Sequence, residues 1–222
     1  MGLDLINSHV AKIILAIEEG DSINQVSRKT GGSYGWTHQW VERLEEINVI
    51  ERDRGIQIKD DEFAQDFEDL AKMVLEREID YDDAYLLPNF SGLEYRYSHT
   101  DAVYIWTEGG YQIGRNQDDY PIFIDVLEDD INEWQAFFNE FSLESNIEER
   151  IQDGEPGIYY VLFPREEFES TWSDSASVMP LDETVEWAKK YEVNFQPALE
   201  MLDEMYELEL GVEYRERNVM EQ

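Results

Sequence analysis

Residues 27–58, SRKTGGSYGWTHQWVERLEEINVIERDRGIQI, contain the periodicity and the turn signals that decide the fold of the N-terminal part of the chain. A Gly-Gly pair closes one short helix, and SYGWTHQWVERLEEINVI then repeats apolar residues at helical spacing. Two short β-prone runs follow around Asp53-Arg54-Gly55, which is a hairpin-turn signal. The stretch therefore predicts a short helix, a glycine turn, a longer helix and a two-stranded ribbon.

The residues before this stretch predict one more helix. NSHVAKIILAIEEG has an apolar face at helical spacing, with Asn7 or Ser8 as its cap and Gly20 at its end. Asp21 or Ser22 is expected to cap the short second helix. In the longer third helix, the stripe expected to be buried consists of Trp36, Trp40, Val41, Leu44 and Ile47.

Charge is distributed very unevenly along the chain. The 222 residues include 52 Asp and Glu but only 17 Lys and Arg, for a net charge of −35. Residues 1–59 carry a net charge of −2 and residues 60–222 a net charge of −33. A basic island relative to its own chain is the electrostatic footprint of a phosphate-facing surface. The cations of this island are Arg28, Lys29, Arg43, Arg52 and Arg54.

The acidic composition also indicates the solvent in which the chain folds. A compact chain of this charge repels itself at ordinary ionic strength. In molar salt the Debye length falls to about 3 Å, which screens most of that repulsion. The acidic, Lys-poor composition resembles that of proteins from salt-accumulating halophiles, of archaeal type. An acidic partner-binding or nucleic-acid-mimicking surface is the alternative, but the spread of acidic residues along the chain favours the halophile.

Several classes of protein are disfavoured by the composition. The absence of Cys excludes disulfides, thiol catalysis and Cys-based metal sites. No apolar run approaches the roughly 20 residues that span a bilayer, and MGLDLINSHV lacks the basic leader of a signal peptide. We therefore expect a cytoplasmic protein without membrane contact.

The order helix, short helix, glycine turn, longer helix and ribbon resembles a winged helix-turn-helix domain over about residues 5–60. In that family, INQVSRKTGGSYGWTHQWVERLEEINVIERDRG would supply the second helix, the turn, the recognition helix and the wing. The resemblance implies DNA binding, since a recognition helix enters the major groove and its N-terminal residues reach base edges. A protein-interaction module or a simple packing unit is the alternative interpretation.

The expected DNA contacts divide between bases and phosphates. Gln39 carries the amide that pairs with adenine, and the hydroxyls of Ser33 and Thr37 suit several bases. Cations of the second helix and the wing would contact phosphates. High salt weakens phosphate contacts, so binding would depend more on base contacts, apolar contacts and dimerisation. The predicted interface is Arg28, Lys29, Ser33, Tyr34, Thr37, His38, Gln39, Arg43, Arg52 and Arg54.

The rest of the chain predicts a linker helix and a small α/β unit. The helix runs from about Asp61 to Arg77, and LLPNFSG marks a boundary near 80–92. HTDAVYIWTEGG favours a helix, YQIGR a short strand, YPIFIDVL and GIYYVLFP strands, and EDDINEWQAFFNEF a helix. A helix begins at Asp182, and Pro197 lies near the first turn of the last one. The apolar stripe of the linker helix is Phe63, Phe67, Leu70, Ala71 and Val74.

The fold class expected is therefore α+β. Residues 1–80 form a winged helix with its linker helix, and residues 90–222 form an α/β domain for sensing, partner binding or dimerisation. This layout resembles antitoxins of the AbiEi type, which repress their own operon and counter a nucleotidyltransferase toxin. The resemblance implies an alternative function, in which the second unit binds a toxin.

Motifs of catalysis do not appear in the sequence. A nucleotidyltransferase needs a Gly-Ser turn shortly before a pair of metal-binding acids, but Gly32-Ser33 lies in the helix-turn-helix, far from Asp80 and Asp82. There is no P-loop, and the three His form no metal spacing. We expect no enzyme, cofactor or metal, although an enzyme domain fused to a winged helix is a third interpretation. A small-molecule pocket, if present, could be lined by Tyr95, Tyr97, His99, Trp106 and Arg115, although core packing is favoured for these residues.

The expected function is that of a sequence-specific transcriptional regulator acting on double-stranded DNA. A homodimer, a small-molecule effector and a protein partner of the second unit all stay open.

Overall fold

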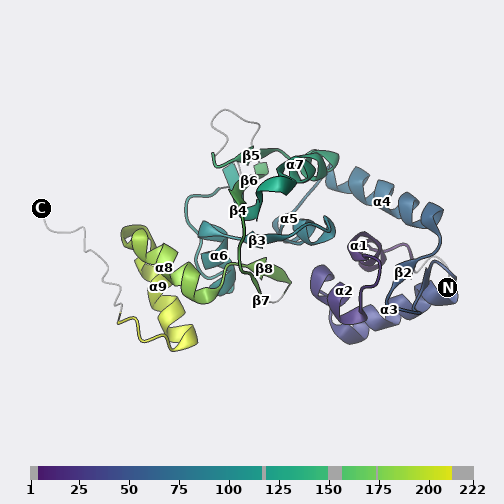
Figure 1. The fold of residues 1–222 in the computed structure, drawn as a ribbon, viewed down its shortest axis with the longest axis horizontal. Coiled ribbons are helices and arrows are strands. Elements are labelled where there is room, and N and C mark those ends of the chain that lie inside the picture. Colours follow the sequence, from purple (N-terminus) through teal and green to yellow (C-terminus); the bar gives the residue numbers. More distant parts are fainter. Residues whose placement is uncertain (1–4, 117–118, 150–156, 174, 212–222) are drawn as a thin grey trace, which may run out of the picture.

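The computed structural model describes residues 5–116, 119–149, 157–173 and 175–211, and the ends of the two expected domains, residues 1–4 and 212–222, lie outside it. The described chain is α+β, with helices around one six-stranded sheet and a separate two-stranded ribbon. No helix within it is long and apolar enough to cross a membrane. The N-terminal unit (Figure 1) comprises α1 (Ser8–Ala16), α2 (Ile23–Thr30), α3 (Tyr34–Glu46), β1 (Ile50–Glu51), β2 (Gln57–Ile58) and α4 (Asp61–Leu75).

Local hydrogen bonds set the limits of the first three helices. The side chain of Asn7 accepts from two backbone N–H groups at the start of α1. Ser22 and Gln25 form a reciprocal capping box at the start of α2, and Ser33 caps α3. Helix α2 ends at Gly31, whose φ of 70° lies in the left-handed region that favours glycine. The predicted turn between α2 and α3 thus has a local cause in the sequence.

The ribbon is attached to the loop between α1 and α2. Ile56 donates its N–H to the carbonyl of Asp21 (2.7 Å) and accepts from the N–H of Gly20 (3.0 Å). Gly55 makes this contact possible, because a Cβ on it would lie 2.3 Å from the Gly20 carbonyl oxygen and its φ is +110°. The ribbon is therefore held against the helices and not free in solvent.

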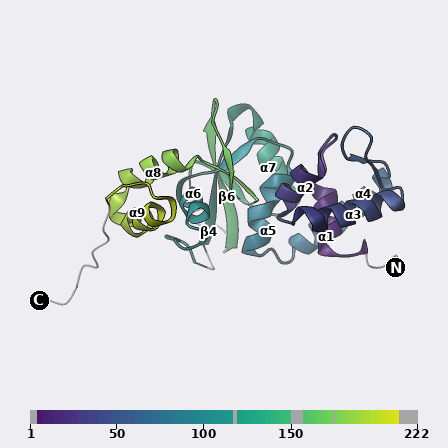
Figure 2. The same cartoon turned by 90° about the horizontal axis from the view of Figure 1, so that it is seen from below.

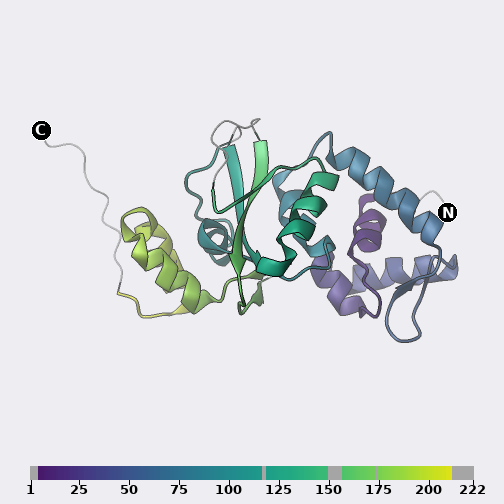
Figure 3. The ribbon, with the colours of Figure 1, turned by 45° about the horizontal axis from the view of Figure 1, so that its top comes forward.

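A single apolar cluster fills the N-terminal unit. Its fully buried members come from all three helices and the ribbon, and Trp40 is only 8% exposed. Helix α4 crosses α1 (Figure 3), but its predicted apolar stripe is only partly covered. Leu70 is 48% exposed and Val74 is 55% exposed. Part of the face that the sequence assigns to the interior thus stays at the surface.

The segment expected to be a boundary, residues 80–92, is helical and belongs to a core. It forms α5 (Tyr81–Leu86) and the short helix η2 (Leu87–Phe90). Ala84 and Leu87 are fully buried against the sheet of the second unit. The core of that unit therefore begins before residue 90.

The second unit is built on a sheet with the strand order β5-β6-β4-β3-β8-β7. β4 and β6 are parallel over nine pairs, β3 is antiparallel to β4, and β7 and β8 form an antiparallel hairpin. α5 and α7 lie on one side of this sheet, and α6, α8 and α9 lie on the other (Figure 2). The remaining elements are β3 (Tyr95–Tyr97), α6 (His99–Trp106), β4 (Asp119–Leu127), η3 (Glu128–Asp130), α7 (Ile131–Glu140), β5 (Ser145–Ile147), β6 (Gly157–Arg165), β7 (Thr171–Ser173), β8 (Ala176–Val178), α8 (Leu181–Lys190) and α9 (Glu192–Tyr206).

The predicted helices and long strands of this unit are confirmed, but two details are wrong. YQIGR, residues 111–115, forms no strand. Pro197 lies inside α9 and not near its start, because α9 begins at Glu192. Most of the aromatic residues pack as expected, and Phe138 stacks on Tyr160 with ring centroids 3.7 Å apart.

One buried side chain connects the two units. Asn89, 5% exposed, donates to the carbonyl of Lys29 in α2 (3.0 Å) and to the carbonyl of Ser175 beside β8 (2.7 Å). Its own carbonyl oxygen accepts from the hydroxyl of Tyr95 in β3 (2.5 Å). A neutral amide is well suited here, since it satisfies donors and acceptors without a buried charge.

Candidate nucleic-acid interface

Helix α3 has one buried and one open side. It packs on α1, α2 and β1, and its opposite side lies at the edge of the molecule (Figures 1 and 3). The N-terminal half of this open side carries Ser33, Tyr34 and Gln39, all exposed. Tyr34 is 52% exposed and its ring lies 5.9 Å from that of His38. The first turns of α3 thus present hydroxyl, aromatic and amide groups to solvent.

Trp36 belongs to this open side, contrary to the predicted core position. It is 43% exposed, and its ring makes edge contacts with His9 (5.3 Å) and Trp40 (5.9 Å). The buried positions are Thr37, Trp40, Val41 and Leu44, and the spacing i, i+3, i+4, i+7 leaves position 36 beside that stripe. An exposed indole is therefore a candidate contact that the sequence pattern missed.

The sequence predicts that Thr37 contacts a base, but its side chain is buried, so this prediction is wrong. Thr37 is 1% exposed, in the place that the pattern assigned to an apolar residue. A Cβ on Gly32 would lie 3.1 Å from its hydroxyl oxygen, so Thr37 sits beneath the glycine turn. Its hydroxyl does not reach a base edge from this position.

The prediction that Lys29 contacts phosphate is also wrong, because its ammonium group is held inside the N-terminal unit. Its side chain is 14% exposed and forms ion pairs with Glu18 (2.5 Å) and Asp21 (2.9 Å). It also donates to the carbonyl of Ala16 (3.3 Å). Asp21 is only 5% exposed, so Lys29 neutralises a buried carboxylate and fixes α2 to the preceding loop.

Arg52 shares its charge with a neighbouring carboxylate. Its guanidinium donates twice to one oxygen of Glu45, with an Nε–O distance of 2.8 Å and a second, shorter contact from Nη2. The same hydrogen bonds lower the pKa of Glu45, which favours its ionised form. Arg52 is therefore a brace between α3 and β1, and its predicted role as a phosphate contact is not supported by this geometry.

Two cations of the predicted island are exposed, and a third, Arg43, is partly buried. Arg28 and Arg54 are exposed and form no ion pair with any residue that the structure describes. The guanidinium of Arg43 lies over the ring of Trp40, 5.0 Å from its centroid. Arg28 lies in the last turn of α2, before α3 in the chain, and Arg54 lies in the turn of the ribbon that follows α3.

Acidic residues limit this surface at the C-terminal half of α3. Glu42 and Glu46 are exposed, and Glu42 lies 3.4 Å from Nδ1 of His38. His38 is thus paired within the helix. The open face of α3 consists of Ser33, Tyr34, Trp36, Gln39 and Arg43, and the candidate interface adds Arg28 of α2 and Arg54 of the ribbon turn.

The residues considered for a pocket in the second unit belong mostly to its core. Tyr95 and Tyr97 are buried in the sheet, and burial raises the pKa of both hydroxyls. His99, with a φ of 54°, lies against Phe163 with ring centroids 4.1 Å apart. Burial lowers the pKa of His99 to about 4, so its ring is neutral near pH 7.

The second unit also contains a buried ionic network that the sequence did not reveal. The carboxylate of Asp101 pairs with Arg115, and both side chains are at most 1% exposed. Asp101 also accepts from the N–H of Phe123 (2.7 Å) and from the hydroxyl of Tyr85. In the sequence, Asp101 looks like an ordinary residue near the start of a helix. Its ion-pair and hydrogen-bond partners come from other parts of the chain, so the sequence pattern does not reveal them.

A second network fixes α8 to the sheet. Arg96 in β3 donates to Asp125 in β4 (2.8 Å) and, with both terminal nitrogens, to Glu183 in α8 (2.6 and 2.8 Å). Such two-pronged pairing is a feature of arginine and carboxylate. These networks use residues from several elements to hold the second unit together.

The chain matches no protein-family model, and searches of curated proteins and of solved structures found no significant match. Among the residues that the structure describes, no three His, Asp or Glu side chains are grouped to hold a metal ion. The functional argument therefore depends on the geometry of the chain itself.

Proposed function

We propose that the segment from α1 to β2 is a winged helix-turn-helix domain, that α3 enters the major groove of duplex DNA, and that the protein is a sequence-specific transcriptional regulator. The observation that carries this proposal is the open face of α3. Its N-terminal half is exposed and free of carboxylates in a chain with a net charge of −35. N-terminal residues of a recognition helix are the ones that contact base edges.

The groups on this face suit base contact more than phosphate contact. Gln39 has the donor and acceptor pair that matches adenine, and Tyr34 and Trp36 offer apolar surface to thymine methyl groups. With Lys29 and Arg52 engaged in ion pairs, Arg28 and Arg54 are the exposed cations of the island that form no ion pair with any described residue. Each phosphate contact contributes about 0.9 to the slope of log K against log salt. These two arginines therefore contribute a slope of about −2 per chain, which is compatible with binding in molar salt.

The working environment proposed is a cytoplasm rich in salt. The excess of acid over base and the six lysines among 222 residues support it. At low ionic strength, repulsion within the acidic second unit would oppose folding. DNA binding is therefore to be measured in molar KCl.

The experiment begins with selection of bound duplexes from a random pool in molar KCl, because the chain itself names no operator. Fluorescence anisotropy then measures the affinity of variants for the selected duplex and for a scrambled one. Arg28→Ala and Arg54→Ala should weaken both duplexes about equally, whereas Gln39→Ala should reduce the difference between them. Arg77→Ala, an exposed arginine beyond the end of α4, is the matched control and should change neither.

Two results would contradict the proposal that α3 reads DNA. One is that no duplex is enriched by the selection, which would favour the alternatives in which this face binds a protein, as in an antitoxin. The other is enrichment that Gln39→Ala, Trp36→Ala and Arg28→Ala all leave unchanged. In that case the DNA contact would lie elsewhere on the chain.

A further inference from the structure

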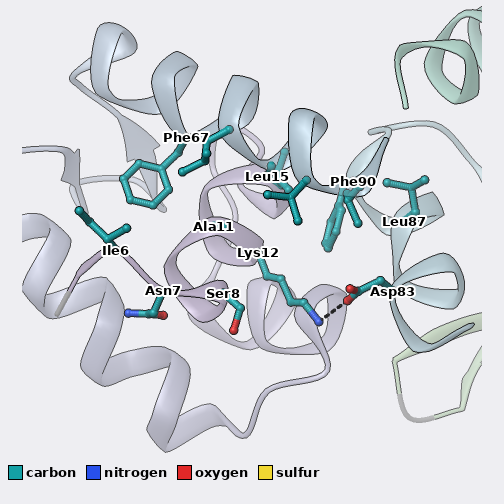
Figure 4. Close-up of a pocket in the computed structure, with 14 residues that line it drawn as sticks. Ile6, Asn7, Ser8, Ala11, Lys12, Leu15, Phe67, Asp83, Leu87 and Phe90 are labelled. Carbon is teal, nitrogen blue, oxygen red and sulfur yellow. Dashed lines mark ion pairs between the residues drawn. The ribbon is translucent and has the colours of Figure 1, made fainter. Parts of the chain in front are cut away.

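An apolar cavity lies between the N-terminal unit and the α/β unit. Its volume is about 290 Å³, and its walls come from the segment before α1, from α1, from α4 and from η2. Figure 4 shows Phe67 of α4 toward one end of this space and Phe90 of η2 toward the other, with Leu15 of α1 between them. We propose that this cavity is a binding site for a small, neutral, apolar molecule that contacts both units at once.

The walls of the cavity are almost entirely hydrocarbon. Ten of its fourteen lining residues are apolar, including the partly exposed Leu70 and Val74 of α4. In a chain so rich in acid, apolar surface left open in a concavity is a feature of a binding site. A ligand in the cavity would remove the exposed parts of these side chains from water, which supplies its driving force.

The charged groups at the cavity already satisfy each other. Nζ of Lys12 lies 2.7 Å from a carboxylate oxygen of Asp83, and Figure 4 shows this pair at one edge of the space. The aliphatic part of Lys12 lines the cavity while its ammonium group is engaged. An anionic ligand would have to displace Asp83, and a cationic one would have to displace Lys12. The site therefore favours a molecule without net charge.

The volume sets the size of the ligand. An apolar protein cavity of about 150 Å³ holds one benzene ring. A space of about 290 Å³ is about twice as large and suits a molecule of two fused or linked rings, or an aliphatic chain of similar bulk. It stands at the lower end of the range of ligand pockets.

Charge also argues against a second copy of this chain as the occupant. Helix α4, which forms one wall, contains five Asp and Glu and one Lys. Two copies that met through this face in a symmetric dimer would bring these like charges together. A small molecule inserted between α4 and α1 meets the apolar side chains and leaves the acids in solvent.

Filling the cavity would connect the two units. Three of its walls belong to the N-terminal unit, and Leu87 and Phe90 belong to η2, which packs on the sheet core. A bound molecule would stabilise the arrangement in which these walls are close, since a ligand favours the conformation it binds best. The cavity thus has the position expected of an effector site, and the inference does not depend on DNA binding.

The test uses the full chain in molar KCl and 1-aminonaphthalene, a neutral two-ring fluorophore whose emission shifts to the blue in apolar surroundings. We expect saturable binding of one probe per chain. Ala71→Phe, which places a ring in the cavity from α4, should weaken binding at least tenfold, and Ala11→Leu provides a milder second variant from α1. Ala136→Phe, on the exposed side of α7, is the matched control and should bind as the native chain does. Far-UV circular dichroism confirms that each variant is folded.

Competition and mass measurements complete the test. Naphthalene should displace the probe, and 1-naphthoate, its anionic relative, should do so at least tenfold less well. The proposal is overturned if binding is not saturable, if both cavity variants bind normally, or if the anion competes better. It is also overturned if light scattering shows a dimer that Ala71→Phe separates, because the face would then contact a second copy.

Discussion

The Asp101–Arg115 pair allows a prediction whose magnitude follows from its burial. Asp101→Asn keeps the shape of the side chain but removes the charge that balances Arg115, whose side chain is 1% exposed. Removal of one partner of a buried pair costs about 3–5 kcal/mol, because the other charge stays in a low dielectric without compensation. For a chain of this size each kcal/mol lowers Tm by about 2–4 °C, so the expected fall is about 6–20 °C.

The assay is thermal unfolding followed by circular dichroism, at moderate and at molar KCl. The pair is enclosed, so salt should change the loss very little. Glu186→Gln is the control, because it removes the partner of the exposed Lys189 (2.9 Å) and should cost no more than about 0.5 kcal/mol. The double change Asp101→Leu with Arg115→Met should restore part of the stability. An Asp101→Asn variant within about 1 kcal/mol of the native chain would show that Arg115 is not confined as described.

Three further outcomes test other parts of the structure. Gly55→Ala should destabilise the N-terminal unit by about 1–3 kcal/mol, since its Cβ would lie 2.3 Å from the Gly20 carbonyl oxygen. Gly35→Ala in α3 is the contrast, because its Cβ would meet no atom within 4 Å and the change should be neutral or stabilising. Chemical denaturation of both variants measures the difference. Phe138→Ala should cost about 3–5 kcal/mol through the cavity it leaves beside Tyr160, and an unchanged denaturation midpoint would contradict the stacking. In an NMR titration, the ring of His99 should stay neutral until about pH 4. Because its pKa in the folded chain lies below the value near 6.5 of an unfolded chain, its contribution to stability is complete above pH 6.5 and is lost as the pH falls toward 4. Protonation of His99 near pH 6.5 in the folded chain would show that the ring is not buried.

The elements that the sequence predicts correctly are those whose causes are local. Helices α1 to α3 begin at capping residues that are visible in the chain, and α2 ends at the predicted glycine. The predicted ends of the other two are less accurate, because α1 ends at Ala16, before Gly20, and α3 ends before Ile47, which is 45% exposed. The strands missed by the prediction, β3, β5, β7 and β8, are three residues long, too short to show a period. Their pairing depends on neighbours that are distant in sequence.

The errors in the candidate interface have a tertiary origin. Trp36 and Thr37 are adjacent in α3. A rotation of the helix about its axis by one residue would exchange which of these two side chains is exposed to solvent. Composition favoured Trp36 for the interior, but the space under the glycine turn is small and takes threonine instead. Lys29 and Arg52 appeared free because their carboxylate partners, Asp21 and Glu45, lie seven or eight residues away. A basic island in the sequence is thus an upper limit on the positive charge available to a partner.

The buried side chain of Asn89 joins the N-terminal unit to the second unit by hydrogen bonds. Its single amide group contacts the last turn of α2, the hairpin at one edge of the sheet and β3, the strand beside that hairpin. The same amide thus holds the hairpin and the residues immediately before the glycine turn, and α3 packs on the helix that these residues end. A substitution that removes this amide should therefore loosen α2, and α3 with it, from the sheet of the second unit.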